Sequence, residues 1–436
     1  MSDHNLKPTM GLDRRNTRRY HGLVSLSLVA LLGVWWHTTH ENPRITIPSP
    51  VMPTPNAFDF YVKAGNAVVG ERQLWEAFDT RPATRYSLIQ EKAVILQNAN
   101  VFVALHRGFA YRYQNPPIRS MWEETPYYSK FRSAAQLLGL QGQVRSEEGD
   151  WSGATESYLD AVRLGEDIPR GSPLIGTQVG HNCRSYGIRP MWGVVDHLNA
   201  AQSRATIARL ASIMDRHVPL TASIQEEKWL GQAELMQLFD STSKPGVAKG
   251  DSESHLAEAT VANAIFLFAS KKRIMRDYTT YMDQNSQQAR RPYSLHLQPP
   301  REPTDAINRF ILPLFMHARL QDTNSQTQDG LLLITLALHA FRLENGRYPG
   351  SLTELAPAYL KKLPSDLFAA QGTFKYRPGS DAHDLHPYVL YSVGPDGKDD
   401  GGTPIYDAKM QVGAHPEARY RVVTDSVGDI VAGKNR

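Results

Sequence analysis

The sequence predicts an α+β protein: an N-terminal transmembrane helix, then an all-α domain, then a long helix packed on a small antiparallel sheet. Three observations support this prediction. An uncharged apolar stretch follows a basic N-terminal head, residues 56–282 repeat apolar positions three and four apart, and residues 305–436 end in short alternating segments. A chain of 436 residues with 21% charged residues is long enough for two or three domains and is too polar for a polytopic membrane protein.

The net charge is concentrated at the N-terminus. The chain has 48 basic and 44 acidic residues, which gives +4. Residues 1–21 hold five basic and two acidic residues and so carry +3 of that charge. The remainder of the chain is close to neutral, so we expect no nucleic-acid partner. The single cysteine, Cys183, excludes an intramolecular disulfide.

Residues 22–38 form the predicted membrane anchor. The stretch contains no Asp, Glu, Lys or Arg, and Trp35 and Trp36 would lie at the far interface. Because arginines precede it, the positive-inside rule places the tail 1–21 in the cytoplasm and the bulk of the chain outside, as in a single-pass protein of the inner membrane. A cleaved signal peptide and a buried core helix remain alternatives. Five prolines in the linker 39–55 would hold the next domain off the membrane.

Residues 56–282 are predicted to form a helical domain. Within it, residues 134–167 indicate a helical hairpin that resembles one tetratricopeptide repeat. The resemblance implies that Gly142 lies at the close contact between the two helices and that Tyr158 fills the gap. An ordinary antiparallel helix pair is the alternative, since no second unit follows at the same period.

Residues 283–304 are rich in glutamine and proline and indicate a linker to a last domain at 305–436. A long helix is expected from Asp305 to Asn345, interrupted at Pro313 and ending before a glycine. Its last part has Leu331, Ile334, Leu338 and Phe341 at 3-4-3 spacing, which predicts one apolar face. Strand candidates follow that are β-branched or aromatic and are bounded by Gly, Pro or Asp: GTFKYRPG (372–379), HPYVLYSVG (386–394), RYRVVTD (419–425) and GDIVAG (428–433).

Residues 331–431 contain four motifs in a fixed order: ALHAFRLENGRYPGSLTELAPAYLKKLPSDLF, FKYRPG, YVLYSVGPDGKDDGG and GDIV. In this order they resemble the globular domain of the type II secretion major pseudopilin, a member of the type IV pilin-like superfamily. The resemblance implies a long helix packed on a small sheet, and an acidic loop that binds calcium.

The acidic loop also has the chemistry of a calcium site by itself. It places Asp396, Asp399 and Asp400 among four glycines, and Ca²⁺ takes six to eight oxygen ligands from carboxylates and carbonyls in a flexible loop. An ordinary solvated turn is the alternative, because DG and GG pairs are common hairpin signals.

The resemblance implies particular calcium ligands. Asp396 matches the family's DG carboxylate, and Val393 matches a carbonyl donor. Asp400 would supply the second carboxylate. Asp429, or else Asp425, would close the site from the last motif.

The predicted function is a membrane-anchored, non-enzymatic interaction scaffold of the cell envelope with a calcium-stabilised C-terminal domain. Its expected partners are the membrane, through the N-terminal helix, and other envelope or secretion proteins. One alternative is a component of a type II secretion or pilus-like apparatus. The other is an extracytoplasmic hydrolase that uses His181 or Glu227 in the helical domain. Cys183 is expected to be a buried structural residue.

Overall fold

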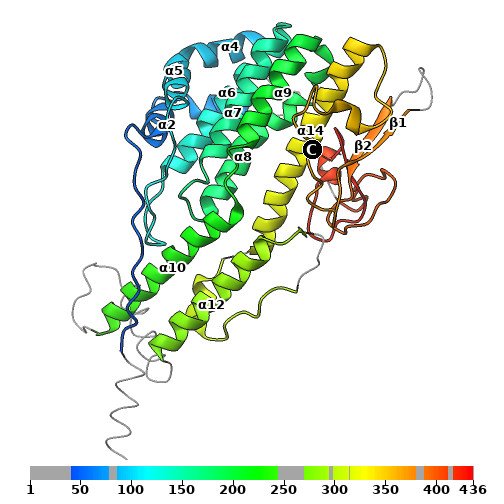
Figure 1. Cartoon of the computed structure of the whole chain (residues 1–436). Helices are drawn as coiled ribbons and strands as arrows, with labels where there is room; N and C mark the ends of the chain where they lie inside the picture. The colour runs from blue at the N-terminus through cyan, green and yellow to red at the C-terminus, as the bar shows by residue number, and fades with distance from the viewer. Residues whose placement is uncertain are drawn as a thin grey trace, which may run out of the picture. The chain divides into compact units, whose positions relative to one another are not determined.

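The computed structural model describes residues 41–77, 86–243, 270–293, 298–313, 315–379, 387–410 and 416–435. The structure is 58% helical, with twelve α-helices in these ranges and one three-stranded antiparallel sheet (Figure 1). The predicted class, an α+β protein with a transmembrane helix and a helix-on-sheet domain, is therefore wrong. The fold is predominantly α-helical, and the sheet is a small addition to it.

The helices are α2 (Ala57–Asn66), α3 (Glu71–Ala77), α4 (Leu88–Gln97), α5 (Ala99–Gly108), α6 (Tyr127–Glu147), α7 (Trp151–Asp167), α8 (Leu174–Met191), α9 (Ala200–Met214), α10 (Leu220–Ser243), α12 (Lys271–Ala289), α13 (Ala306–Ile311) and α14 (Phe315–Asn345). Short 3₁₀ helices accompany them in the described part of the chain, namely η1 (Val195–His197), η3 (Leu352–Leu355) and η4 (Pro416–Tyr420). The predicted interruption near Pro313 is confirmed, because α13 ends before it and α14 begins after it.

No helix within these described ranges combines the length and apolarity that a bilayer crossing requires. The prediction of a single-pass inner-membrane protein is corrected accordingly, since the structure does not support it. The segment 22–38 that carried the prediction lies outside the described residues.

Contacts divide the chain into two compact units. Unit 1 comprises Met1–Thr46, Glu234–Thr279 and Pro303–Phe310, and unit 2 comprises Ile47–Ala233, Thr280–Glu302 and Ile311–Arg436. Within unit 1, Lys271 Nζ donates to the Phe239 carbonyl at 3.0 Å, and Asn308 Nδ2 donates to the Ile274 carbonyl at 3.0 Å. The domain boundaries expected from composition stay a prediction.

Unit 2 is built on neighbouring helices, with α6, α7 and α8 packed together and α14 packed against α9 and α8 (Figure 1). The α6–α7 pair forms the hairpin that the sequence predicts. Its close contact is also the predicted one, because a Cβ at Gly142 would overlap the ring of Tyr158. That overlap explains why only glycine fits at this position of α6.

Helix α14 explains why the predicted class is wrong. Every residue from Leu331 to Ala340 is buried, so this part of the helix has no solvent-facing side. Apolar residues all round a helix indicate a core helix rather than an amphipathic one. The helix accordingly packs against α9 and α8 as well as the sheet, and it belongs to the helical core of unit 2.

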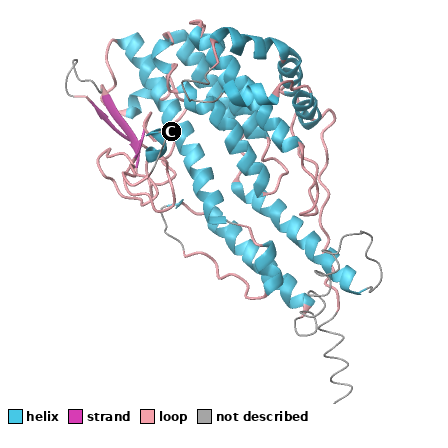
Figure 2. Cartoon of the chain, turned by 180° about the vertical axis from the view of Figure 1, so that it is seen from behind, coloured by secondary structure: helices cyan, strands magenta, loops and turns pink. Residues whose placement is uncertain are grey.

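The sheet has the order β1 (Lys375–Pro378), β2 (Tyr388–Ser392) and β3 (Ile430–Val431), all antiparallel (Figure 2). Three of the four predicted strand segments contribute to it. The segment 419–425 does not, because its first two residues end η4 and the rest is a loop. Ser426 Oγ accepts a hydrogen bond from the Val423 amide at 2.9 Å, which supplies that amide with a local partner in place of a ladder bond.

Candidate functional site

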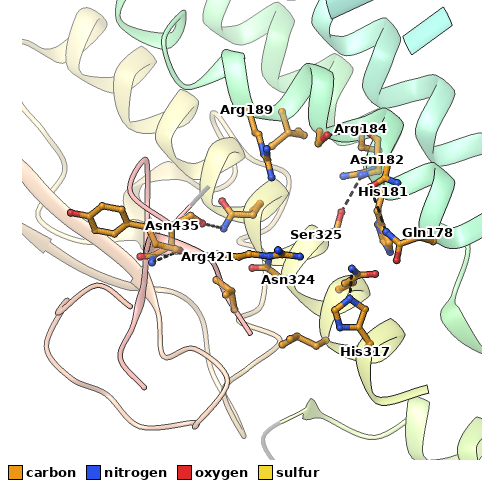
Figure 3. A pocket seen from close by; sticks show the side chains of 17 residues that line it. Gln178, His181, Asn182, Arg184, Arg189, His317, Asn324, Ser325, Arg421 and Asn435 are labelled. Atoms are coloured by element: carbon orange, nitrogen blue, oxygen red, sulfur yellow. Dashed lines mark hydrogen bonds between the residues drawn. The ribbon is translucent and has the colours of Figure 1, made fainter. Parts of the chain in front are cut away.

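A pocket of about 260 Å³ lies between α8, α14 and the C-terminal segment 420–435 (Figure 3). We call it the polar pocket, and all of it belongs to unit 2. Its lining residues are Gln178, His181, Asn182, Arg184, Ser185, Ile188 and Arg189 of α8, His317, Leu320, Gln321, Asn324, Ser325 and Gln328 of α14, and Tyr420, Arg421, Val422 and Asn435.

Two arginines of the polar pocket have no acidic partner among the described residues. Arg189 and Arg421 are both exposed, and neither forms an ion pair with any residue that the structure describes. Figure 3 shows them on different elements, α8 and the C-terminal segment. No aspartate or glutamate is among the residues that line the pocket. The pocket therefore presents positive charge and no negative charge to a ligand.

Amide side chains supply further polar groups. Some are already used: Gln328 Nε2 donates to the Asn435 carbonyl, and Asn435 Nδ2 donates to the carbonyls of Ile405 and Tyr420 at 2.8 and 3.0 Å. These bonds fix the C-terminal segment against α14. Asn324 differs, because its Oδ1 is buried without a hydrogen-bond partner. A buried acceptor of this kind is costly unless a ligand or water supplies a donor.

A buried ionic cluster lies behind the pocket wall. The Arg184 guanidinium is paired with Glu166 of α7 and Asp329 of α14, and its Nε donates to Ser325 Oγ at 3.1 Å. All three charged side chains are 5% exposed. Burial raises the pKa of Asp329, and the neighbouring Arg184 opposes that rise. The cluster joins three helices and fixes the wall from which His181 and Ser325 face the pocket.

Two histidines flank one carboxylate beside this cluster. His217 Nδ1 lies 2.9 Å from Glu166 Oε1, which makes it a hydrogen-bonded nitrogen. Asp322 Oδ1 lies 3.7 Å from His217 Nε2 and 4.0 Å from His181 Nε2. His217 Nε2 and both nitrogens of His181 are buried without a hydrogen-bond partner. Burial lowers the pKa of both imidazoles, and Asp322 acts in the opposite direction.

Only one of the two residues that the hydrolase alternative offered lies at the pocket. His181 lines the polar pocket, whereas Glu227 does not, and its carboxylate accepts a hydrogen bond from the Leu174 amide at 2.9 Å. Cys183 is fully buried, and burial raises the pKa of its thiol to about 12. A thiol with so high a pKa is hardly ionised at neutral pH and is therefore a poor nucleophile. Arg189 and Arg421 were not predicted, because single arginines far apart in the chain carry no sequence signal.

Two of the predicted calcium ligands, Asp399 and Asp429, use their carboxylates in hydrogen bonds within the fold. Asp429 is buried, and its two oxygens accept the amides of Gly402 at 2.7 Å and Asp400 at 3.3 Å. Asp399 Oδ1 accepts the Tyr391 hydroxyl at 2.9 Å. Burial raises the pKa of Asp429 to about 6, the two backbone amides oppose the rise, and Asp399 and Asp400 add to it.

Val393 and Asp396 are further predicted calcium ligands, and they lie beside Asp399 and Asp400 in the sequence. Asp396 Oδ1 accepts the Lys398 amide at 3.1 Å, and the Val393 amide donates to Asp366 Oδ2 at 3.0 Å. Among the described residues, no group of three or more His, Cys, Asp or Glu side chains is arranged to hold a metal ion. Calcium at this loop stays a prediction.

Comparison with protein-family models, with curated proteins and with solved structures finds no match to this chain. The likeness of residues 331–431 to a pseudopilin therefore stays a prediction, and the geometry of unit 2 is what supports a function.

Proposed function

We propose that this protein binds a small anionic molecule in the polar pocket. The observation that carries the proposal is the presence of two arginines, Arg189 and Arg421, that have no described acidic partner and line one pocket without acidic residues. An arginine presents five donors in a planar fork that suits carboxylate and phosphate oxygens. An anion between the two guanidiniums would provide the negative charge that the chain does not provide there.

The shape and the remaining groups of the pocket support a small ligand. Its volume of about 260 Å³ is close to the lower end of small-molecule sites, which begin at about 300 Å³. The amides of Gln178, Asn182 and Asn324 are suited to bind hydroxyl groups of the same ligand. The Arg184 cluster holds the wall in place, so little ordering is needed when a ligand binds.

Calorimetric titration of the full chain with sulfate and with inorganic phosphate tests the proposal. We expect saturable binding, weakened at least about tenfold in Arg189→Ala and in Arg421→Ala, since each removes charge-assisted hydrogen bonds. Arg107→Ala is the matched control, because Arg107 is exposed on α5 and lies outside the pocket. Equal affinities in all four proteins, or no binding of either anion, would refute the pocket as an anion site.

The interaction scaffold, the secretion-apparatus component and the hydrolase remain separate predictions. The polar pocket is compatible with a scaffold whose partner presents an anionic group. It also gives the hydrolase alternative one feature, because His181 lines a pocket that could hold a substrate. Binding is the proposal that the described groups support directly.

A further inference from the structure

The buried imidazole of His181 has a position that the fold itself does not explain. Both of its nitrogens are enclosed and lack a hydrogen-bond partner, although the residue lines a polar pocket. Buried polar atoms are satisfied in the great majority of cases, and exceptions call for an explanation such as a ligand or a catalytic role. The side chain as a whole is 15% exposed, although both of its nitrogens are enclosed.

We propose that His181 binds the anion in its protonated form, so that the polar pocket takes up one proton together with its ligand. This inference rests on the proposed anion site. In the protonated ring both nitrogens are donors. Nε2 lies 4.0 Å from Asp322 Oδ1, close enough for attraction between charges but beyond hydrogen-bond distance. Nδ1 is enclosed in the unliganded protein, and the ring would have to turn it toward the pocket to donate to the anion.

The charged groups around His181 determine when the proton binds. From α14, Asp322 favours the charged ring, and from the segment between α9 and α10, His217 disfavours it. Glu166 and Asp329 share the single positive charge of Arg184, so the ionic cluster has a formal charge of −1 when both carboxylates are ionised.

The arginines on the pocket side add positive charge. Arg189 and Arg421 line the same pocket, and each disfavours a charged His181 while the pocket lacks a ligand. The exposed imidazole of His317 lines the pocket as well. Burial also lowers the pKa of His181 below its ordinary value of about 6.5. The ring is therefore neutral near pH 7 in the unliganded protein. A bound dianion reverses the local charge and raises the pKa of the same ring.

Sulfate is the suitable probe, because its charge does not change between pH 5 and 8. We expect its affinity for the full chain to increase as the pH falls, by up to tenfold per pH unit where one proton is taken up. Calorimetry at pH 6.5 in two buffers of different ionisation enthalpy should report uptake of close to one proton per sulfate. Both measurements use the unaltered chain and do not depend on a variant that folds.

Three substitutions show which histidine takes up the proton when sulfate binds. His181→Asn should bind sulfate with nearly pH-independent affinity and no proton uptake, and it removes no hydrogen bond from the fold. His217→Gln is the control, because His217 does not line the pocket; it is checked for an unchanged midpoint of thermal unfolding and should keep the pH dependence. His317→Gln tests the other histidine that lines the pocket. Loss of the pH dependence in folded His317→Gln or His217→Gln, or its persistence in folded His181→Asn, would overturn the assignment to His181.

The two proposals fail in different ways. Sulfate binding that depends on Arg189 and Arg421 but shows no proton uptake in the unaltered chain would overturn the role of His181 and leave the anion site intact. Absence of sulfate binding at every pH would overturn both.

Discussion

Gly142 on α6 lies directly against the aromatic ring of Tyr158 on α7, so closely that a β-carbon on the glycine would overlap the ring. The contact joins the two helices of the predicted hairpin. Tyr158 is 3% exposed, and its hydroxyl lies 3.3 Å from Ser146 Oγ on α6. The ring therefore has little freedom to move away from an added methyl group.

Gly142→Ala should lower the free energy of unfolding by about 1–3 kcal/mol, the usual cost of overpacking a filled core. Urea unfolding followed by circular dichroism measures the change. Gly193→Ala is the control, because a β-carbon there makes only an ordinary contact with the Pro190 carbonyl. If the overlap is the cause, adding Gly142→Ala to a Tyr158→Leu protein should cost clearly less than adding it to the unaltered chain. An equal cost in both backgrounds would show that the contact with Tyr158 is not responsible.

Arg184→Met should destabilise the protein more than Gly142→Ala does. It leaves Glu166 and Asp329 buried without their cation, which costs about 3–5 kcal/mol in comparable buried pairs. The measurement is urea unfolding at pH 7. Arg189→Met, on the same helix but exposed, should change the free energy of unfolding by no more than about 0.5 kcal/mol. A similar effect of both arginine substitutions would contradict the role assigned to the ionic cluster.

The pair Arg204–Glu344 should contribute a pH-dependent part of the stability. Arg204 Nε and Nη2 each lie 2.7 Å from one carboxylate oxygen of Glu344, and the Tyr359 hydroxyl donates to the same carboxylate. These bonds lower the pKa of Glu344 to about 2. The unfolded carboxyl has a pKa of about 4.3, so the contribution is complete above that pH and is lost as the pH falls toward about 2.

Glu344→Gln should therefore lower the free energy of unfolding at pH 7 by at most about 1 kcal/mol, because both side chains of the pair are partly exposed. The difference from the unaltered chain should shrink between pH 4.5 and pH 3 in urea unfolding. Glu124→Gln serves as the control, since Glu124 is exposed. A difference that stays constant from pH 7 to pH 3 would show that the ion pair is not its source.

Calcium at the acidic loop can be tested by differential scanning calorimetry of the full chain with millimolar Ca²⁺ and with a chelator. A bound ion should raise the unfolding midpoint by mass action. Asp396→Ala should remove most of that rise, whereas Asp215→Ala, an exposed aspartate outside the loop, should not. Identical unfolding midpoints with calcium and with chelator would contradict the predicted calcium site.

Local patterns predicted the local structure well. The hairpin with Gly142 and Tyr158 and the break at Pro313 depend on residues near one another in sequence. The fold class was not predicted correctly, because the apolar spacing in α14 indicated one buried face. In the structure, residues 331–340 are buried on every side, and only tertiary packing against α8 and α9 decides that.

The candidate site was predicted only in part. The sequence indicates His181 as an ionisable residue in a helical region. Nothing near it in the sequence indicates Asp322 or His217, which lie on other elements. Arg421 is even less predictable, because it sits in a segment that alternates like a strand and instead follows η4 as a loop. Because the pocket is formed by three segments far apart in the chain, its residues have no regular spacing by which the sequence could indicate the pocket.

The hydrogen bonds of Asn435 have a practical consequence for fusions to this chain. Its side-chain amide donates hydrogen bonds to the carbonyls of Ile405 and Tyr420, and its backbone carbonyl accepts one from Gln328. Residue 435 therefore anchors the segment that carries Arg421. An affinity tag or reporter inserted next to this residue would disturb one wall of the pocket. Fusion proteins for ligand screening should therefore carry a long flexible spacer there, and a weakened ligand response in a short-spacer fusion would reflect the tag rather than the protein.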